Sequence, residues 1–207
     1  MRAINHHITP FIKKLLRIAK KSDGNFGYIK SFLSFASIMT ESDTKQRIRK
    51  AAHDLVIQYN KYACKKDIDN SENAVHEIFL VMEMMAEMFK TMNPSILHDM
   101  QKYHPAAFSK FKKHKNEFLY NVCTQNLLRG VQEELYRPEI SVDILCRYRV
   151  ETMFIPFHPE FQQSLKQSLA KIEEEILMHF FFGLVSQKGY KLIIKYREQI
   201  EKESAKK

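Results

Sequence analysis

The sequence is poor in the residues that interrupt regular structure and make tight turns. Its 207 residues include only five glycines and six prolines, and they include no tryptophan. Sheet proteins of this size use more glycine in their turns, so this scarcity favours an all-α fold. The core must then be filled by the 15 Phe, 9 Tyr and 10 Met residues. A core rich in Met suits adaptable packing or an adaptable pocket.

Cysteines and long apolar runs are also scarce. Cys64, Cys123 and Cys146 are odd in number and widely spaced, with no C-x-x-C pair. Neither a disulfide framework nor a zinc site is therefore indicated, and reduced thiols in a cytoplasmic protein are expected. No apolar run reaches the roughly 18 residues of a membrane-spanning helix. The N-terminus does not have the pattern of a secretory signal. We therefore expect a cytoplasmic protein with no transmembrane segment.

No catalytic motif is present in the sequence. It contains no Gly-rich phosphate loop, nucleophile elbow or paired-carboxylate motif, so we expect no enzyme activity, no catalytic residues and no cofactor. Glu175 and His179 are four residues apart, a spacing at which two side chains on a helix can share a metal ion. Helical metal centres need such motifs on several helices, and there is no second copy here. We expect no metal site, and interpret His179 as a buried or dimer-facing side chain.

Positive charge is concentrated in the first third of the chain. Residues 1–70 contain 14 Lys and Arg against 6 Asp and Glu, whereas residues 71–207 contain 19 against 18. This asymmetry has two interpretations. The basic part contacts an anionic partner, such as nucleic acid or a membrane surface, or it is a solvated basic face without a partner.

Residues 1–38 are compositionally distinct and form a basic extension. After Pro10, the apolar residues at 11, 12, 15, 16 and 19 recur at helical spacing, with Lys and Arg opposite them. This pattern predicts an amphipathic helix at 11–21, which lies on an anionic membrane or packs on the body. A third interpretation is that 1–38 is translated from an upstream start and is not native. The residues that follow Met39, TESDTKQR, are typical of a protein's beginning.

Apolar residues recur at helical spacing along the rest of the chain. The pattern predicts a helix from Asp43 to Tyr62, followed by a polar connector at 65–71 and then an all-α body. Helices of that body are predicted at 72–91, 106–128, 141–154, 160–182 and 188–202.

Several segments are similar to a known family of regulators. The stretch TKQRIRKAAHDLVIQY at 44–59 resembles the opening helix of TetR/AcrR-type transcriptional regulators. From Ser71 onward the chain resembles their helical C-terminal domain, in the segments ENAVHEIF, MNPSILHDMQKYHPAAFSKFKKHKNEFL, NLLRGVQEELYRPEISVDIL, RVETMFIPF and HFFFGLVSQKGYKLIIKY. The resemblance implies that 39–70 is a remnant of the DNA-binding domain and linker helix. It also implies that 71–207 is a TetR-like sensor and dimerisation domain.

The chain departs from the family where DNA is read. In the family, the first helix leads into a glycine turn, a second helix and a recognition helix with a T-I/L-Y-x-Y/H-F-x-x-K signature. Here Tyr59 is followed by NKYACKK, which resembles the far end of the family's fourth helix. Base readout needs a helix seated in the major groove. We therefore expect specific DNA binding to be lost, leaving weak, non-specific backbone contacts from Lys45, Arg47, Arg49 and Lys50.

A smaller departure from the family is Glu134, at a position where a glycine is frequent.

The resemblance also implies a small, apolar effector bound inside the bundle. We expect a cavity of about 300 Å³ between the helix at 72–91 and those at 106–128 and 141–154. Aromatic, Met and a few polar side chains either line this cavity or form ordinary core, and the sequence does not separate the two interpretations. The residues are Met82, Met85, Phe89, His98, Phe111, Phe118, Tyr120, Tyr148 and Met153.

The last two predicted helices carry more apolar residues than one small body readily covers. In TetR-like proteins the corresponding helices form a four-helix interface with their mates, so we expect a homodimer. The predicted interface residues are Ile172, Ile176, His179, Phe180, Leu184 and Ile193.

Three functions from different classes are compatible with these observations. The first is a TetR-like regulator reduced to a homodimeric sensor. The alternative is a peripheral membrane or protein-interaction module that uses the helix at 11–21. An all-helical enzyme is the weakest of the three, because no catalytic constellation is present.

Overall fold

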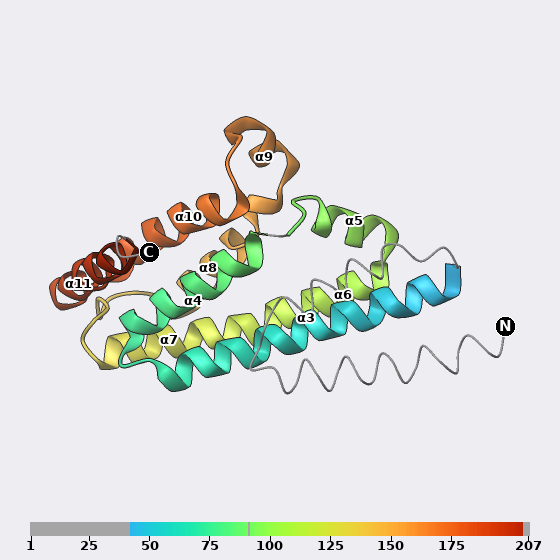
Figure 1. Ribbon diagram of the computed structural model, residues 1–207. Helices are drawn as coiled ribbons and strands as arrows, with labels where there is room; N and C mark the ends of the chain where they lie inside the picture. The colour runs from blue at the N-terminus through green and yellow to red at the C-terminus, as the bar shows by residue number, and fades with distance from the viewer. Residues whose placement is uncertain (1–41, 91, 205–207) are drawn as a thin grey trace. The chain divides into compact units, whose positions relative to one another are not determined.

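The described part of the chain folds into helices joined by short connections (Figure 1). A computed structural model describes residues 42–90 and 92–204. Within these residues no strand is present, and one isolated bridge joins Tyr136 to Val185. The prediction of an all-α fold is confirmed. The chain divides into two compact units between Ala63 and Cys64, and each unit is described by itself.

The first described helix, α3, runs from Ser42 to Asn70 without interruption. The predicted end at Tyr62 and the polar connector at 65–71 are therefore wrong. The helix continues because Ala63 and Cys64 are buried, and because Lys65 and Asp69 form an ion pair at 3.5 Å one turn apart. The helix ends at Asn70, and the hydroxyl of the next residue, Ser71, donates to the Ile68 carbonyl at 2.8 Å.

The predicted helix at 11–21 lies outside the described residues, and so does the rest of the 1–38 extension. Lys45, Arg47, Arg49 and Lys50 belong to α3, but their side chains also lie outside what the structure describes.

Eight α-helices and two short helical segments of other types make up the described part of the second unit after α3. The segment η1 is a π-helix and η2 a 3-10 helix. Their bounds are α4 Ala74–Phe89, α5 Ile96–Tyr103, α6 Pro105–Lys113, η1 His114–Leu119, α7 Tyr120–Gln132, α8 Val142–Thr152, η2 Ile155–Phe157, α9 Pro159–Leu165, α10 Leu169–Leu184 and α11 Gln187–Ser204.

Most of the predicted helices lie close to these bounds, with two differences. The helix predicted at 106–128 is α6, η1 and α7 in direct succession, so its middle has the wider π geometry. The helix predicted at 160–182 is broken into α9 and α10. The break lies at Lys166, which adopts the left-handed conformation with φ 50°. A non-glycine residue in that conformation ends a helix, and Ser168 then caps α10.

Two hydrophobic clusters fill the interior of the second unit. The main core is built by α4, α7, α8, α10, α11 and the loop residues Leu135 and Tyr136. A second cluster forms around Met85, Phe89, Phe157 and Leu169, where the end of α4 meets η2 and the start of α10.

The turn between α7 and α8 contains a residue in the left-handed conformation. Glu134 has φ 60°, a left-handed conformation that glycine adopts without strain. The backbone amides of Leu135 and Tyr136 both donate to the Gly130 carbonyl, at 2.8 and 2.9 Å. The Tyr136 ring fills the space beside Gly130, where an added Cβ would lie 2.1 Å from it.

Candidate functional site

A buried ion pair joins α8 to α10 at the boundary between the two clusters. Arg149 lies one helical turn from Cys146 of the main core and one turn from Met153, which packs on the second cluster. On α10, Glu173 likewise lies one helical turn from Leu177 of the main core and one turn from Leu169 of the second cluster. Because residues four apart share a helix face, both charged side chains face the interior.

The pair is almost completely shielded from solvent. The side chain of Arg149 is 5% exposed and that of Glu173 is 3% exposed. Arg149 donates one hydrogen bond, from Nη2 to Oε1 of Glu173. Within the described residues, Nη1 of Arg149 and Oε2 of Glu173 have no hydrogen-bond partner. Burial raises the pKa of Glu173, and Arg149 opposes this shift.

This buried ion pair retains hydrogen-bonding capacity inside the fold. Each buried donor or acceptor left without a partner costs about 1–3 kcal/mol. A ligand that carries an acceptor beside a donor, such as a carboxamide, can bond Nη1 of Arg149 and Oε2 of Glu173 together. The apolar side chains on either side then favour an apolar body for the same ligand.

The predicted pocket residues are distributed over both clusters. Met82 and Tyr120 pack against the main core. Met85 and Phe89 belong to the second cluster, and Met153 packs against it. The structure therefore places these residues on both sides of the Arg149–Glu173 pair, where they are core side chains.

The other four predicted pocket residues lie further out. The ring of Phe111 meets Phe154 edge-on at 5.0 Å, and Phe118 stacks on His114 at 5.0 Å. His98 is exposed, and Tyr148 is 47% exposed although its ring lies 5.9 Å from that of Phe180. The structure thus does not bring the nine residues together around one space.

Sequence analysis missed Arg149 and Glu173. Their signal is a charged residue inside an apolar stripe: Glu173 stands four residues from both Leu169 and Leu177, and Arg149 stands between Cys146 and Met153. Such a residue can also point outward at the edge of a stripe. The pattern becomes decisive only when both helices are seen to face each other.

The predicted dimer interface requires a correction. Ile172, Phe180, Leu184 and Ile193 are at most 7% exposed, because they face the core of their own chain. These four side chains are not available to a second copy. Of the predicted set, Ile176 is half-buried and His179 is exposed.

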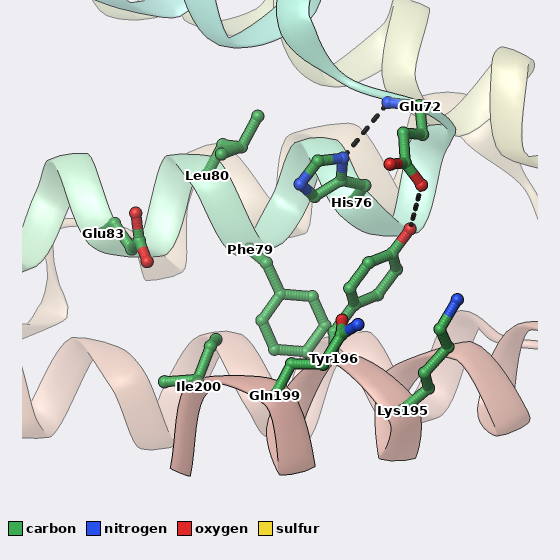
Figure 2. Close-up of a pocket in the computed structure, with 9 residues that line it drawn as sticks. All are labelled: Glu72, His76, Phe79, Leu80, Glu83, Lys195, Tyr196, Gln199 and Ile200. Atoms are coloured by element: carbon green, nitrogen blue, oxygen red, sulfur yellow. Dashed lines mark hydrogen bonds between the residues drawn. The ribbon is translucent and has the colours of Figure 1, made fainter. Parts of the chain in front are cut away.

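A surface groove of about 220 Å³ lies between α4 and α11, away from the predicted cavity (Figure 2). Figure 2 shows Phe79 and Tyr196 between the two helices. The His76 ring stacks on Tyr196 at 5.0 Å and accepts a hydrogen bond from the Glu72 amide. Tyr196 donates to Glu72 at 3.1 Å. The groove between α4 and α11 is lined by Glu72, His76, Phe79, Leu80, Glu83, Lys195, Tyr196, Gln199 and Ile200.

Across residues 42–90 and 92–204, no group of three potential metal ligands is found. Glu175, which the sequence pairs with His179, instead forms an ion pair with Lys171 at 2.7 Å. Among the same residues, no helix has the length and apolar character to cross a bilayer.

Comparison with family models, curated proteins and solved structures finds no match for the chain. The similarity to TetR/AcrR regulators therefore rests on the residues quoted above.

Proposed function

We propose that this chain is a homodimeric, small-molecule-sensing helical domain of the TetR/AcrR type that no longer binds DNA specifically. The observation that supports it best is the buried Arg149–Glu173 pair, which lies among apolar side chains and retains one donor and one acceptor.

The energetics of buried ion pairs favour a binding role for this one. Desolvating two charges costs several kcal/mol, and the attraction between them repays this only when their hydrogen bonds are complete. Arg149 and Glu173 do not meet that condition within the described residues. An effector with one polar group and an apolar body completes them, and the flexible Met85 and Met153 side chains adapt to its shape.

The unbroken α3 supports the loss of DNA reading. A helix-turn-helix needs a turn and a second helix to seat in the major groove. Between Ser42 and Asn70 the chain is one helix, and α4 begins after a short turn. The basic residues at 45–50 then provide only phosphate contacts, which are salt-sensitive and blind to sequence.

The proposed dimer uses a surface different from the buried residues first predicted. Phe182 is 38% exposed, Tyr190 is 51% exposed, and their rings lie 5.9 Å apart. We assign this exposed aromatic pair of α10 and α11 to the contact with a second copy. Light scattering at micromolar concentration should give a dimer, and a variant with Phe182→Ser and Tyr190→Ser should be monomeric. Phe161→Ser, at an equally exposed phenylalanine of α9, is the matched control and should remain dimeric.

Effector binding is tested with a library of small amides, lactams and carboxylic acids screened by thermal shift. Compounds that raise the melting temperature of the wild type should fail to raise that of the variant Arg149→Met/Glu173→Leu. The matched control removes an exposed Lys–Glu pair of α10, through Lys171→Met/Glu175→Leu. If ligands raised the melting temperature equally in the wild type and both variants, the Arg149–Glu173 pair would not be part of the binding site. A library in which no compound raised the melting temperature would count against a sensing function.

The alternative function, a peripheral membrane or interaction module, is favoured by the charge excess of residues 1–70. Liposome sedimentation of the chain with and without residues 1–38 distinguishes this alternative from the sensing function. Binding to anionic vesicles that requires 1–38 supports the alternative.

A further inference from the structure

The groove between α4 and α11 differs in charge from one end to the other. Figure 2 shows Glu83 at one end and Lys195 at the other. Between them lie the apolar side chains of Phe79, Leu80 and Ile200. Phe79 is buried in the main core, whereas Leu80 is half-buried and Ile200 is 37% exposed. The groove, with a volume of about 220 Å³, therefore has an apolar middle between two charged ends.

Contacts inside the protein already occupy the end of the groove at which Lys195 lies. The Tyr196 hydroxyl accepts a hydrogen bond from Nδ2 of Asn73 at 3.0 Å and donates one to Glu72 at 3.1 Å. The Tyr196 ring stacks on the His76 ring, and the Lys195 ammonium lies over the Tyr196 ring, 5.9 Å from its centre. The ring face thus already attracts a cation of the chain itself. This end disfavours a second cation, because Lys195 repels it.

The opposite end of the groove is negatively charged. Glu83 is exposed and forms no ion pair within residues 42–90 and 92–204, since Lys90, which follows α4, pairs with Glu87 instead. A second carboxylate acts on this end from α3. Burial raises the pKa of Asp67, Lys66 opposes this shift, and Glu83 adds to it. The Asp67 and Glu83 carboxylates therefore repel each other, and a cation bound at Glu83 relieves this repulsion.

We propose that this groove binds a small protonated amine, with the ammonium group at Glu83 and the apolar body on Phe79, Leu80 and Ile200. The ammonium donates charge-assisted hydrogen bonds to the Glu83 carboxylate. The apolar body removes the exposed parts of Leu80 and Ile200 from water. The volume of about 220 Å³ is below the roughly 300 Å³ of pockets for drug-sized ligands, so the amine is small.

The two ends of the groove determine which amines bind. A linear monoamine places its single charge at Glu83, at the other end of the groove from Lys195. A diamine of the same length brings a second ammonium group towards Lys195, which repels it. An alcohol of the same length keeps the apolar body but loses the attraction of opposite charges at Glu83. We therefore expect the monoamine to bind more tightly than either the diamine or the alcohol.

The test uses the full chain with isotope-labelled isoleucine methyl groups, titrated with hexylamine at neutral pH and followed by NMR. The methyl signal of Ile200 should shift with a dissociation constant on the order of 1 mM. The signal of Ile144, which is 67% exposed on α8, should not move. Hexanol and hexamethylenediamine should bind about five-fold more weakly. Equal affinities for hexylamine and hexanol would overturn the proposal, and so would an unchanged Ile200 signal.

Variants test the role of each end. Glu83→Gln should weaken hexylamine binding about five-fold, whereas Glu160→Gln, at an exposed carboxylate of α9 outside the groove, should leave it unchanged. Lys195→Met should strengthen the binding of hexamethylenediamine about five-fold. Equal weakening in both glutamate variants would contradict the proposal, and an unchanged affinity for the diamine in Lys195→Met would contradict the role of Lys195. Arg149 and Glu173 do not line the groove, so these readouts are independent of the proposed effector site.

Discussion

Two arginines of the described residues make ion pairs with largely or partly buried carboxylates, and the two sets of hydrogen bonds differ in how complete they are. Arg129 of α7 donates through Nε to Glu133 at 2.7 Å and through Nη1 to Ser71 Oγ at 2.6 Å and Glu77 at 3.2 Å. Its Nη2 donates to the Ser71 carbonyl at 3.2 Å. Within residues 42–90 and 92–204, Arg149 of α8 donates only through Nη2, to Glu173. Arg149 is nevertheless the more buried of the two, with its side chain 5% exposed against 30% for Arg129.

The difference separates a network that ties the fold together from the pair that we propose for ligand recognition. Glu133 also accepts from the Ala74 amide at 2.8 Å, so the Arg129 network holds the turn between α3 and α4 against α7. Nε, Nη1 and Nη2 of Arg129 each donate a hydrogen bond within the fold. The Arg149–Glu173 pair joins two helices that apolar contacts already hold together, and it retains unused hydrogen-bonding capacity.

The largest expected loss of stability comes from removing only one partner of the Arg149–Glu173 pair. Arg149→Met leaves Glu173 buried without its cation and should lower the free energy of unfolding by about 4 kcal/mol at neutral pH. The loss should depend on pH, because the pKa of Glu173 is already raised by burial and rises further without Arg149. The folded protein holds the proton of Glu173 more tightly than the unfolded chain does, so the variant is most stable below the unfolded pKa of 4.5. This stability is lost as the pH rises through the pKa that Glu173 has in the folded protein.

Urea denaturation across this pH range measures the effect. The variant should approach the stability of the wild type near pH 4.5 and fall below it at higher pH. A loss of stability independent of pH would show that Glu173 is not the group left uncompensated.

A smaller effect is expected when the complete network loses both partners. Arg129→Met/Glu77→Leu removes both charges but leaves Oε1 of Glu133 and the Ser71 carbonyl without the donors that Arg129 supplies. We expect a loss of about 2 kcal/mol in the free energy of unfolding, because each unpaired group keeps its own penalty. Urea denaturation at pH 7 checks it. A variant as stable as the wild type would mean that this network is as dispensable as the one around Arg149.

The smallest expected effect concerns the turn beside the Arg129 network. Glu134→Gly relieves the left-handed conformation at φ 60° and gives up an exposed ion pair with Lys188 at 3.4 Å. Relief of the strain is worth about 1 kcal/mol and the exposed pair less, so the variant should be slightly more stable. Glu139→Gly, at an exposed residue of the same connection, should bring no gain. Thermal unfolding of both variants makes the comparison.

The sequence predicts the helices better than it predicts the site. Apolar periodicity locates α4, α8 and α11, because each buries one stripe. It misses the continuation of α3 through KKDIDN, where a buried Cys64 outweighs a polar composition. It also misses the break at Lys166, because the left-handed conformation has no signature in a lysine. Periodicity shows that Ile172 and Ile193 face inward but not whether they face their own chain or a second one.

The most direct measurement is the equilibrium urea denaturation of Arg149→Met/Glu173→Leu, without any ligand, beside the wild type. If the pair is kept for recognition, apolar replacements of similar size should leave the free energy of unfolding unchanged or raise it by about 1–4 kcal/mol, since two desolvated charges are removed together. A loss of several kcal/mol, comparable to that of Arg149→Met alone, would show that the pair holds the fold together. It would contradict the assignment of this site to ligand recognition.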